Sequence, residues 1–295
     1  MTLDNSDSTT NSALQGVLMA MIDPINQVFF HSRMLRAWGH SEGMARNMEW
    51  IFKMRRTGEL VGVMHKHGVG PCDRPALDIA IGHDARSVLE ADAAQGRWFI
   101  ALVEDAHEKS GADDAKEILS QILAAERADL ALLESWLQGR EADEVASNVK
   151  HLRPKPGGEE AAIAALNAAL PAMTSAVSQV FFHSLIFKGQ GNAELAQRDL
   201  EGAVIMMYRS EALLERLLDL GGLPSGSDHG KVRIGKDERD ADEAALETHD
   251  AIMATLESSL ATLSGTVDPM THSLVDGIFR AVRDDRTVIA SRLAA

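Results

Sequence analysis

The chain contains eight long segments in which apolar residues recur every three or four positions, the spacing that places them on one face of an α-helix. Glycine and proline separate the segments, as in GVGP at 68–71 and GGLP at 221–224, where a glycine cap followed by proline ends a helix. The segments cover residues 14–37, 44–67, 83–109, 114–138, 159–188, 193–220, 237–263 and 269–293. We therefore predict an all-α protein.

In each half, one connection between these segments is long and the others are short. Residues 72–82 join the second and third segments of the first half, and the second half has a corresponding crossover through VRIG at 232–235. One long crossover among short loops is typical of a four-helix bundle with up-down-down-up connectivity. We predict one such bundle in each half of the chain.

The two halves share a motif that indicates tandem duplication. The hexapeptide QVFFHS occurs at residues 27–32 and again at 179–184, a spacing of 152 in a chain of 295 residues. The segment 143–158 contains HLRPKPGG, whose two prolines are typical of a linker, so we predict domains at 1–142 and 159–295. Two copies of one fold are expected to be related by a pseudo-two-fold axis.

Composition excludes several classes of function. The formal net charge of −15 repels phosphate backbones, and no stretch carries clustered lysine and arginine. Cys72 is the only cysteine, so the chain can form neither an intramolecular disulfide nor a cysteine-linked haem or iron–sulfur site. The N-terminal sequence is polar, and no run of about 18 apolar residues predicts a membrane span. We expect a cytoplasmic protein that binds neither nucleic acid nor membrane.

Read together, these segments resemble bacterioferritin, a haem-binding family of the ferritin-like superfamily. The resemblance rests on INQVFFHSRMLRAWG at 25–39, LLESWL at 132–137, LLERLLDLGGLP at 213–224 and GKVRIG at 230–235. It covers nearly the whole chain, once per half, with the family's elements in their usual order. It implies a bundle that holds a di-iron centre of four glutamates and two histidines. It also implies one haem per two-fold dimer, ligated by a methionine from each partner.

The di-iron ligands implied by the resemblance are largely replaced in both halves. The residues at the ligand positions are Met21, Lys53, Arg56, Gly96, Glu126 and Asp129 in the first half, and Met173, Met206, Arg209, His249, Val282 and Asp285 in the second. Thioether and cationic side chains cannot replace hard carboxylate ligands. We expect no di-iron centre. Glu126 and Asp129 remain as candidates, either in a buried ion pair with Arg56 or in a residual single-metal site.

The haem-ligating methionine implied by the resemblance is retained in both halves. Met54 lies 17 residues before Pro71, and Met207 lies 17 residues before Pro224. Both are candidate axial ligands of haem iron, while the alternative reading makes them ordinary packing residues of a helix. The first half lacks one residue between its QVFFHS motif and this helix position, so a gap placed after the helix would instead put Arg55 at the ligand position.

The resulting hypothesis is a protein that binds one non-covalent haem b per chain through Met54 and Met207, transfers electrons and lacks ferroxidase activity. Its partner would be a redox protein or the subunits of an oxidoreductase complex, and homo- or hetero-oligomers with bacterioferritin-like chains are also open. The alternative function is a haem-free structural subunit that assembles with active bacterioferritin chains. His31 and His183 are expected to form packing or hydrogen-bonding contacts. The sequence leaves open whether the halves pair within one chain or between chains.

Overall fold

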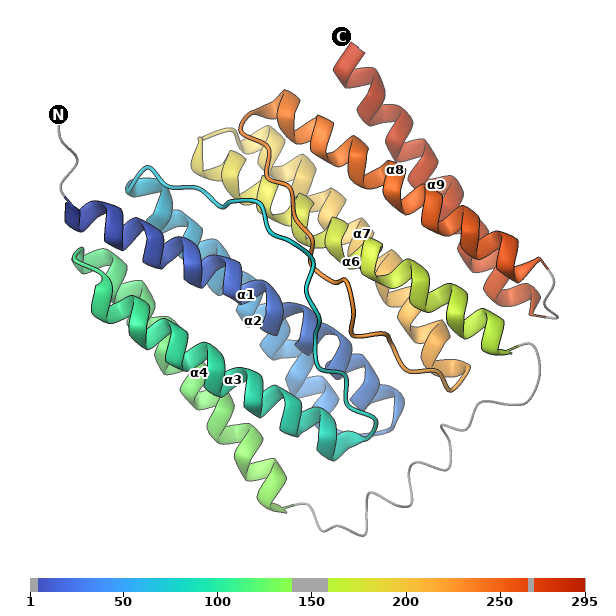
Figure 1. Cartoon of the computed structure of the whole chain (residues 1–295), viewed down its shortest axis with the longest axis horizontal. Coiled ribbons are helices and arrows are strands. Elements are labelled where there is room, and N and C mark those ends of the chain that lie inside the picture. The colour runs from blue at the N-terminus through green and yellow to red at the C-terminus, as the bar shows by residue number, and fades with distance from the viewer. Residues whose placement is uncertain (1–4, 140–158, 265–267, 295) are drawn as a thin grey trace. The chain divides into compact units, whose positions relative to one another are not determined.

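The computed structural model describes residues 5–139, 159–264 and 268–294, and the regular structure of these residues consists of α-helices (Figure 1). The helices are α1 (Asn5–Ala37), α2 (Glu42–Lys66), α3 (Ala85–Lys109), α4 (Asp113–Gly139), α6 (Glu159–Gly189), α7 (Ala193–Asp219), α8 (Glu238–Leu263) and α9 (Pro269–Ala294). The all-α prediction is confirmed, and most helix ends agree with the sequence pattern within two residues. The linker predicted at 143–158 lies outside the described residues.

The chain divides into two compact units that correspond to the two halves except for two short segments. Residues of the first crossover belong to the second unit, and the end of α6 belongs to the first unit. Unit 1 consists of Met1–Cys72, Ala80–Asn148 and Leu185–Asn192, and unit 2 consists of Asp73–Ile79, Val149–Ser184 and Ala193–Ala295.

Each unit is built around its most apolar helix. In unit 1, α1 packs against α2 and α3, and α4 closes the bundle against α3 and α2. In unit 2, α6 approaches α7 closely at Gly202, where an added Cβ would lie 3.3 Å from Val180. Ser259 of α8 also donates a hydrogen bond to the carbonyl of Ala165 of α6 over 2.9 Å. Apolar residues on these facing surfaces form the cores.

The apolar character of α1 and α6 is explained by their central position. By length and composition alone, Ser8–Ala37 and Glu160–Gly189 could each cross a membrane, but 72% and 56% of their most apolar windows are buried in the bundles. A buried core helix and a membrane helix share this composition. These two helices are therefore weak indicators of a membrane span.

Within unit 2, the two crossover segments pair in an antiparallel arrangement. Arg74 and Val232 exchange backbone hydrogen bonds of 2.8 and 2.9 Å, and Leu77 and His229 exchange a second pair of 2.9 Å each. The amide of Ile79 donates to the carbonyl of Gly226 over 2.7 Å. These bonds satisfy backbone groups that irregular segments would otherwise leave to water.

The turns at the ends of the two crossovers show which residues of α3 and α8 are equivalent. An added Cβ would lie 2.4 Å from the amide nitrogen of Val88 at Gly82, and 2.3 Å from that of Ala241 at Gly235, so only glycine fits at either turn. Two residues later, Asp84 and Asp237 cap α3 and α8 by accepting a hydrogen bond from a backbone amide of the first turn. Residues of α3 therefore correspond to residues of α8 that lie 153 positions later.

The same offset relates α2 to α7. Thr57 and Ser210 are both fully buried, and each donates a 2.9 Å hydrogen bond to the carbonyl four residues before it, that of Lys53 or Met206. Lys53 and Met206 are also both buried, at 3% exposure. The residue that follows Lys53, Met54, is thus equivalent to Met207. The missing residue of the first half therefore lies before this part of α2 rather than after it.

Candidate functional site

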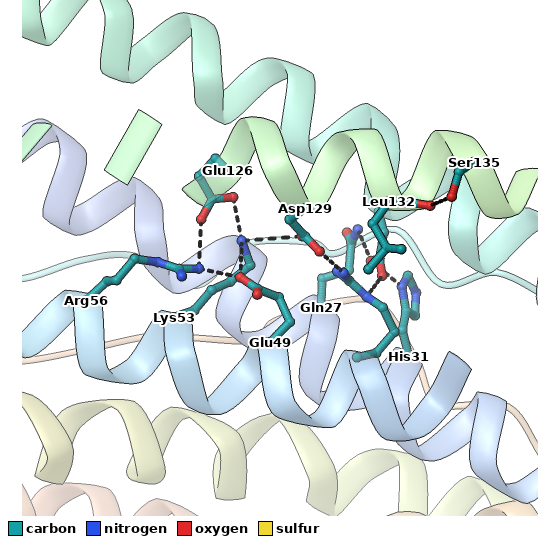
Figure 2. Close-up of polar contacts among 11 residues, drawn as sticks. Gln27, His31, Glu49, Lys53, Arg56, Glu126, Asp129, Leu132 and Ser135 are labelled. Atoms are coloured by element: carbon teal, nitrogen blue, oxygen red, sulfur yellow. Dashed lines mark hydrogen bonds and ion pairs between the residues drawn. The ribbon is translucent and has the colours of Figure 1, made fainter. Parts of the chain in front are cut away.

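The interior of unit 1 contains a buried group of charged side chains between α2 and α4 (Figure 2). The Nζ atom of Lys53 lies 2.5 Å from Oε2 of Glu126, 3.5 Å from Oε1 of Glu49 and 3.9 Å from Oδ2 of Asp129. Arg56 forms ion pairs with Glu49 and, over 3.3 Å, with Glu126. Two cations and three carboxylates therefore meet where the resemblance implies a metal centre.

A second group of polar side chains continues this network toward α1 and α3. Arg46 donates from Nε to Oδ2 of Asp92 over 2.9 Å and from Nη1 to Oδ1 of Asp129 over 2.5 Å. The other oxygen of Asp92 lies 2.6 Å from Nδ1 of His31 and accepts a 3.1 Å hydrogen bond from Nε2 of Gln27. All four helices of the unit thus contribute to one ion-pair network, because Asp129 contacts both Arg46 and Lys53.

The network controls the ionisation of its carboxylates. Burial alone would raise the pKa of Asp92, but the charges of His31 and Arg46 and the hydrogen bonds to the carboxylate hold that pKa well below its ordinary value. At Glu49, burial raises the pKa despite the opposing charges of Lys53 and Arg56. Asp92 therefore remains ionised in the interior and serves as the principal counter-charge for Arg46.

These contacts test the ion pairs that the sequence predicted for Glu126 and Asp129. The predicted ion pair between Arg56 and Glu126 is confirmed. The predicted pairing of Asp129 with Arg56 is wrong, since Arg46 contacts Asp129 instead. The four carboxylates already lie within salt-bridge distance of protein cations, so this set of donors does not fit a di-iron centre. Among the described residues, no group of three or more His, Cys, Asp or Glu side chains could hold a metal ion.

The sequence pattern did not identify Arg46, Glu49 or Asp92 as parts of this site. A signal was present, because Arg46, Glu49 and Lys53 follow one another at spacings of three and four residues and so share one face of α2. Trp50 and Leu60 mark that face as the buried one. Charged residues at helical spacing on an apolar face indicate an interior ion-pair network.

Unit 2 has lost most of this network. Met206 stands where unit 1 has Lys53, and Val282 stands at the position matched with Glu126, and both are buried. Arg209 forms an ion pair with Asp285 over 2.6 Å at the edge of the bundle, where the Asp285 side chain is 42% exposed. The middle of this bundle is therefore apolar where that of unit 1 is ionic.

The QVFFHS histidines form hydrogen bonds, as predicted. Besides Asp92, His31 contacts the carbonyl oxygen of Ala80 over 2.9 Å. In unit 2, Nε2 of His183 accepts a 3.0 Å hydrogen bond from the amide of Gly235 and lies 3.2 Å from the carbonyl oxygen of Arg233. Burial is the main reason that the pKa of His183 falls to about 4. Both histidines therefore hold the end of a crossover against the central helix.

The two candidate haem ligands occupy equivalent places in their own units. Met54 on α2 and Met207 on α7 are half-buried, and each directly follows a residue that points into the core. Arg55 is excluded from this equivalence by the register of the helices, and its side chain is 75% exposed and paired with Glu59. The same helices expose apolar side chains to solvent. These are Met44, Met48, Ile51 and Phe52 on α2, and Leu200, Val204, Ile205 and Tyr208 on α7.

Comparison with known proteins agrees with this architecture. The sequence model of the ferritin-like domain matches residues 163–287. Bacterioferritin of Mycobacterium leprae (strain TN) is 27% identical over 137 residues, which are 46% of this chain and 86% of that protein. Bacterioferritin of Mycobacterium avium is 29% identical over 121 residues, 41% of this chain and 76% of the relative. Bacterioferritin BfrA of Mycobacterium tuberculosis (strain ATCC 25618 / H37Rv) is 33% identical over 89 residues, 30% and 56% of the two chains.

Among solved structures, the Rhodobacter capsulatus bacterioferritin with a metal-free dinuclear site is similar, with a TM-score of 0.44 and 20% sequence identity over 45% of this chain and 83% of that chain. The family match lies in the second half, and the first half shares the QVFFHS motif and the order of four helices with it. Within the ferritin-like superfamily, the chain is bacterioferritin-like, as its similarity to the mycobacterial bacterioferritins indicates.

The ion-pair network predicts a specific double-mutant cycle. Lys53→Met leaves Glu126 buried with only the longer contact to Arg56, so it should lower the free energy of unfolding by about 3 kcal/mol. Adding Glu126→Val, which copies the Met206 and Val282 arrangement of unit 2, should recover most of this loss. Denaturant titration of the single and double variants measures the coupling free energy, expected to be about 2 kcal/mol.

The matched control for this cycle is Arg55→Met on the same helix. Its exposed pair with Glu59 should contribute less than about 0.5 kcal/mol. Equal losses for Lys53→Met and Arg55→Met, or strictly additive effects of Lys53→Met and Glu126→Val, would contradict the description of an interior ion pair.

The lowered pKa of His183 predicts a pH dependence of stability. The unfolded imidazole binds a proton near pH 6.5 and the folded one only near pH 4, so stability is complete above pH 6.5 and decreases as the pH falls to about 4. The expected loss is about 3 kcal/mol across this window. Denaturant titrations at several pH values should show a flatter profile for His183→Gln, while His83→Gln is the control for loss of an exposed imidazole. An unchanged profile in His183→Gln would exclude this residue as the source.

Proposed function

We propose that this bacterioferritin-like protein binds haem b through Met54 and Met207 and acts as an electron-transfer protein without ferroxidase activity. The observation that supports this proposal is the equivalence of the two methionines. Both directly follow the equivalent buried positions Lys53 and Met206, and both are half-buried. The residues around them have diverged strongly between the two units, but the thioether remains at this place in each.

The chemistry of these donors fits a haem iron. Methionine sulfur is a soft, neutral ligand that favours reduced iron. Because Cys72 is the only cysteine, the chain cannot attach haem through a pair of cysteines, so the haem would be bound non-covalently. When bound, the haem would supply reversible one-electron transfer. Met54 and Met207 would be the residues that hold it, and ligation by two thioethers would suit electron transfer rather than reaction with oxygen or peroxide.

The interiors of the two units support the proposed lack of ferroxidase activity. In unit 1, Lys53 and Arg46 neutralise Glu126 and Asp129, the carboxylates that a metal would need. In unit 2, the matching positions carry apolar Met206 and Val282. Among the residues that the structure describes, neither interior offers the paired carboxylates and histidines that bind and oxidise iron(II) in a di-iron centre.

A second candidate function is a structural subunit that binds no haem and assembles with active bacterioferritin chains. The exposed apolar side chains on α2 and α7, such as Phe52 and Tyr208, favour such a role because apolar patches commonly bind other proteins. In either case we infer a protein partner, which is a redox protein for the first function and bacterioferritin-like chains for the second. Both functions place the chain in the cytoplasm.

Substitution of the two methionines tests the haem proposal. Met54→Leu and Met207→Leu keep the volume nearly constant, so each should lower stability by less than about 1.5 kcal/mol. After reconstitution with haem b, the wild-type chain should bind one low-spin haem. Each single substitution should convert its absorption spectrum toward that of a five-coordinate haem, and the double substitution should abolish stable binding.

The matched control is Met206→Leu, which changes the neighbouring core methionine of α7 and should leave the haem spectrum unchanged. A wild-type chain that binds no haem would favour the structural subunit. Unchanged spectra in both Met54→Leu and Met207→Leu would place the ligands elsewhere and assign these methionines to packing.

Iron oxidation provides a separate test of the lost ferroxidase activity. Stopped-flow absorbance after addition of two iron(II) ions per unit should follow the rate of autoxidation in buffer, because Lys53 and Arg46 occupy the places where cations would bind. The variant Lys53→Glu restores one carboxylate only and should remain inactive. Oxidation by the wild-type chain well above the buffer rate would contradict the proposed loss of this activity.

A further inference from the structure

Unit 2 contains a cavity beside His249, a buried residue of α8. The cavity has a volume of about 190 Å³ and is lined by residues of α6, α7, α8 and α9. It lies entirely within this unit, and the proposed haem ligand Met207 is not one of its lining residues. Because an apolar cavity of about 150 Å³ is large enough to hold benzene, this one has room for a single substituted ring.

Comparison of the two units explains how the cavity arises. With the offset of 153 residues, Ala245 stands where unit 1 has Asp92, and Asp199 stands where unit 1 has Arg46. In unit 1, Arg46 and Asp92 form a buried ion pair of 2.9 Å. Both replacements shorten the side chain, and Ala245 and Asp199 line the cavity. Unit 2 therefore has free space where unit 1 has two long side chains.

His249 supplies a hydrogen-bond acceptor to this space. By the same offset it stands where unit 1 has Gly96, and it lines the cavity. Its Nδ1 lies 2.7 Å from the carbonyl oxygen of Ala245, and because a carbonyl only accepts, Nδ1 carries the ring proton. Burial is the main reason that the pKa of His249 is lowered, so the ring is uncharged at neutral pH and Nε2 keeps a lone pair.

The acceptor of His249 lacks a donor within the protein. His249 is 4% exposed, and its Nε2 has no hydrogen-bond partner among the described residues. A buried acceptor without a donor lowers the stability of the folded state. A ligand that carries a donor would remove this loss when it binds.

The walls of the cavity are largely apolar. Ile205 and Met206 of α7 and Val288 and Ile289 of α9 line it. The side chains of Ile205 and Val288 are also partly exposed to solvent, at 48% and 55%, so a ligand can enter beside them. Apolar walls favour an apolar ligand, and the thioether of Met206 makes favourable contacts with aromatic rings.

The charged side chains that line the cavity favour an uncharged ligand. Each of the three carboxylates accepts a hydrogen bond from an arginine, so a charged ligand would add a charge without a counter-ion to a largely buried site. The pairs are Asp199 with Arg198 over 2.8 Å, Asp242 with Arg292 over 2.7 Å and Asp285 with Arg209 over 2.6 Å.

We propose that this cavity binds a small uncharged phenol, with its ring against the apolar walls and its hydroxyl group donating a hydrogen bond to Nε2 of His249. The hydroxyl group supplies the missing donor without adding charge. A single ring with this substituent fits the volume that Ala245 and Asp199 leave open. The site is separate from Met54 and Met207 and does not depend on haem binding.

Calorimetric titration of the full chain with phenol tests the proposal. We expect saturable binding at one site per chain. Benzoate carries a negative charge and no donor at neutral pH, so it should bind at least about tenfold more weakly. Absence of phenol binding would overturn the proposal, and so would binding of benzoate that is as tight as that of phenol.

The variant His249→Phe tests the hydrogen bond. It keeps an aromatic ring but removes the acceptor, so it should weaken phenol binding about fivefold. Toluene has the shape of phenol without the hydroxyl group, and its binding should be the same in the variant and in the wild type. If His249→Phe weakened phenol and toluene equally, or neither of them, His249 would not be the acceptor.

A second variant tests the location and keeps the test valid where His249→Phe does not fold. Ala245→Leu extends a larger side chain into the cavity and should abolish binding of both phenol and toluene. The control is Ala254→Leu, the same substitution at an exposed position of α8 that does not line the cavity. Phenol binding by folded Ala245→Leu at the affinity of the wild type would overturn the assignment to this cavity.

Discussion

A carboxylate inside a four-helix bundle requires a positive charge within a few ångströms, because an uncompensated buried charge destabilises the folded state by several kilocalories per mole. In unit 1, this requirement is met by the protein itself. Lys53 and Arg46 lie 2.5 Å from carboxylate oxygens of Glu126 and Asp129, respectively. These two contacts join α2 to α4, since α2 supplies the cation and α4 the carboxylate in each of them. The same cations exclude the metal ions that the resemblance implies at this place.

Unit 2 meets the same requirement by removing charge from its middle. Met206 and Val282 pack there without any need for a counter-ion, and replacing a buried ion pair by apolar groups of similar volume is often neutral or stabilising. Toward the end of the bundle, unit 2 has Ala245 and Asp199 at the positions of Asp92 and Arg46, and both side chains are shorter than their counterparts in unit 1. The amide of Arg233 fixes the side chain of Gln179, whose Nε2 has no partner among the described residues, whereas Nε2 of Gln27 in unit 1 donates to Asp92. The two units thus fill the same place in the bundle differently, unit 1 with ion pairs and unit 2 with apolar side chains.

The sequence predicted the helices well because their signals are local. Apolar spacing defined α2 and α7, and the glycines before α3 and α8 marked turns that admit no other residue. The interior network was predicted only in part, since it depends on which of several charged residues reach one another between helices. Arg56 was predicted to pair with both acidic residues of α4, yet Arg46, ten residues earlier on α2, reaches Asp129. Such a choice depends on side-chain length and on the packing of α3, which supplies Asp92.

The register of α2 illustrates how tertiary structure resolves what spacing alone leaves open. A missing residue in the first half made Met54 and Arg55 alternatives, because counting from QVFFHS and counting from the proline gave different answers. Burial of Thr57 and Ser210, and their identical hydrogen bonds to the preceding turn, select Met54. The core thus constrains the helix on one side, while Met54 and Met207 lie at the edge of that core. Their side chains contribute little to the ionic or apolar solution inside each unit. Packing alone would therefore not require methionine at this place in two units whose interiors differ so strongly, whereas the haem ligation that we propose would require it in both.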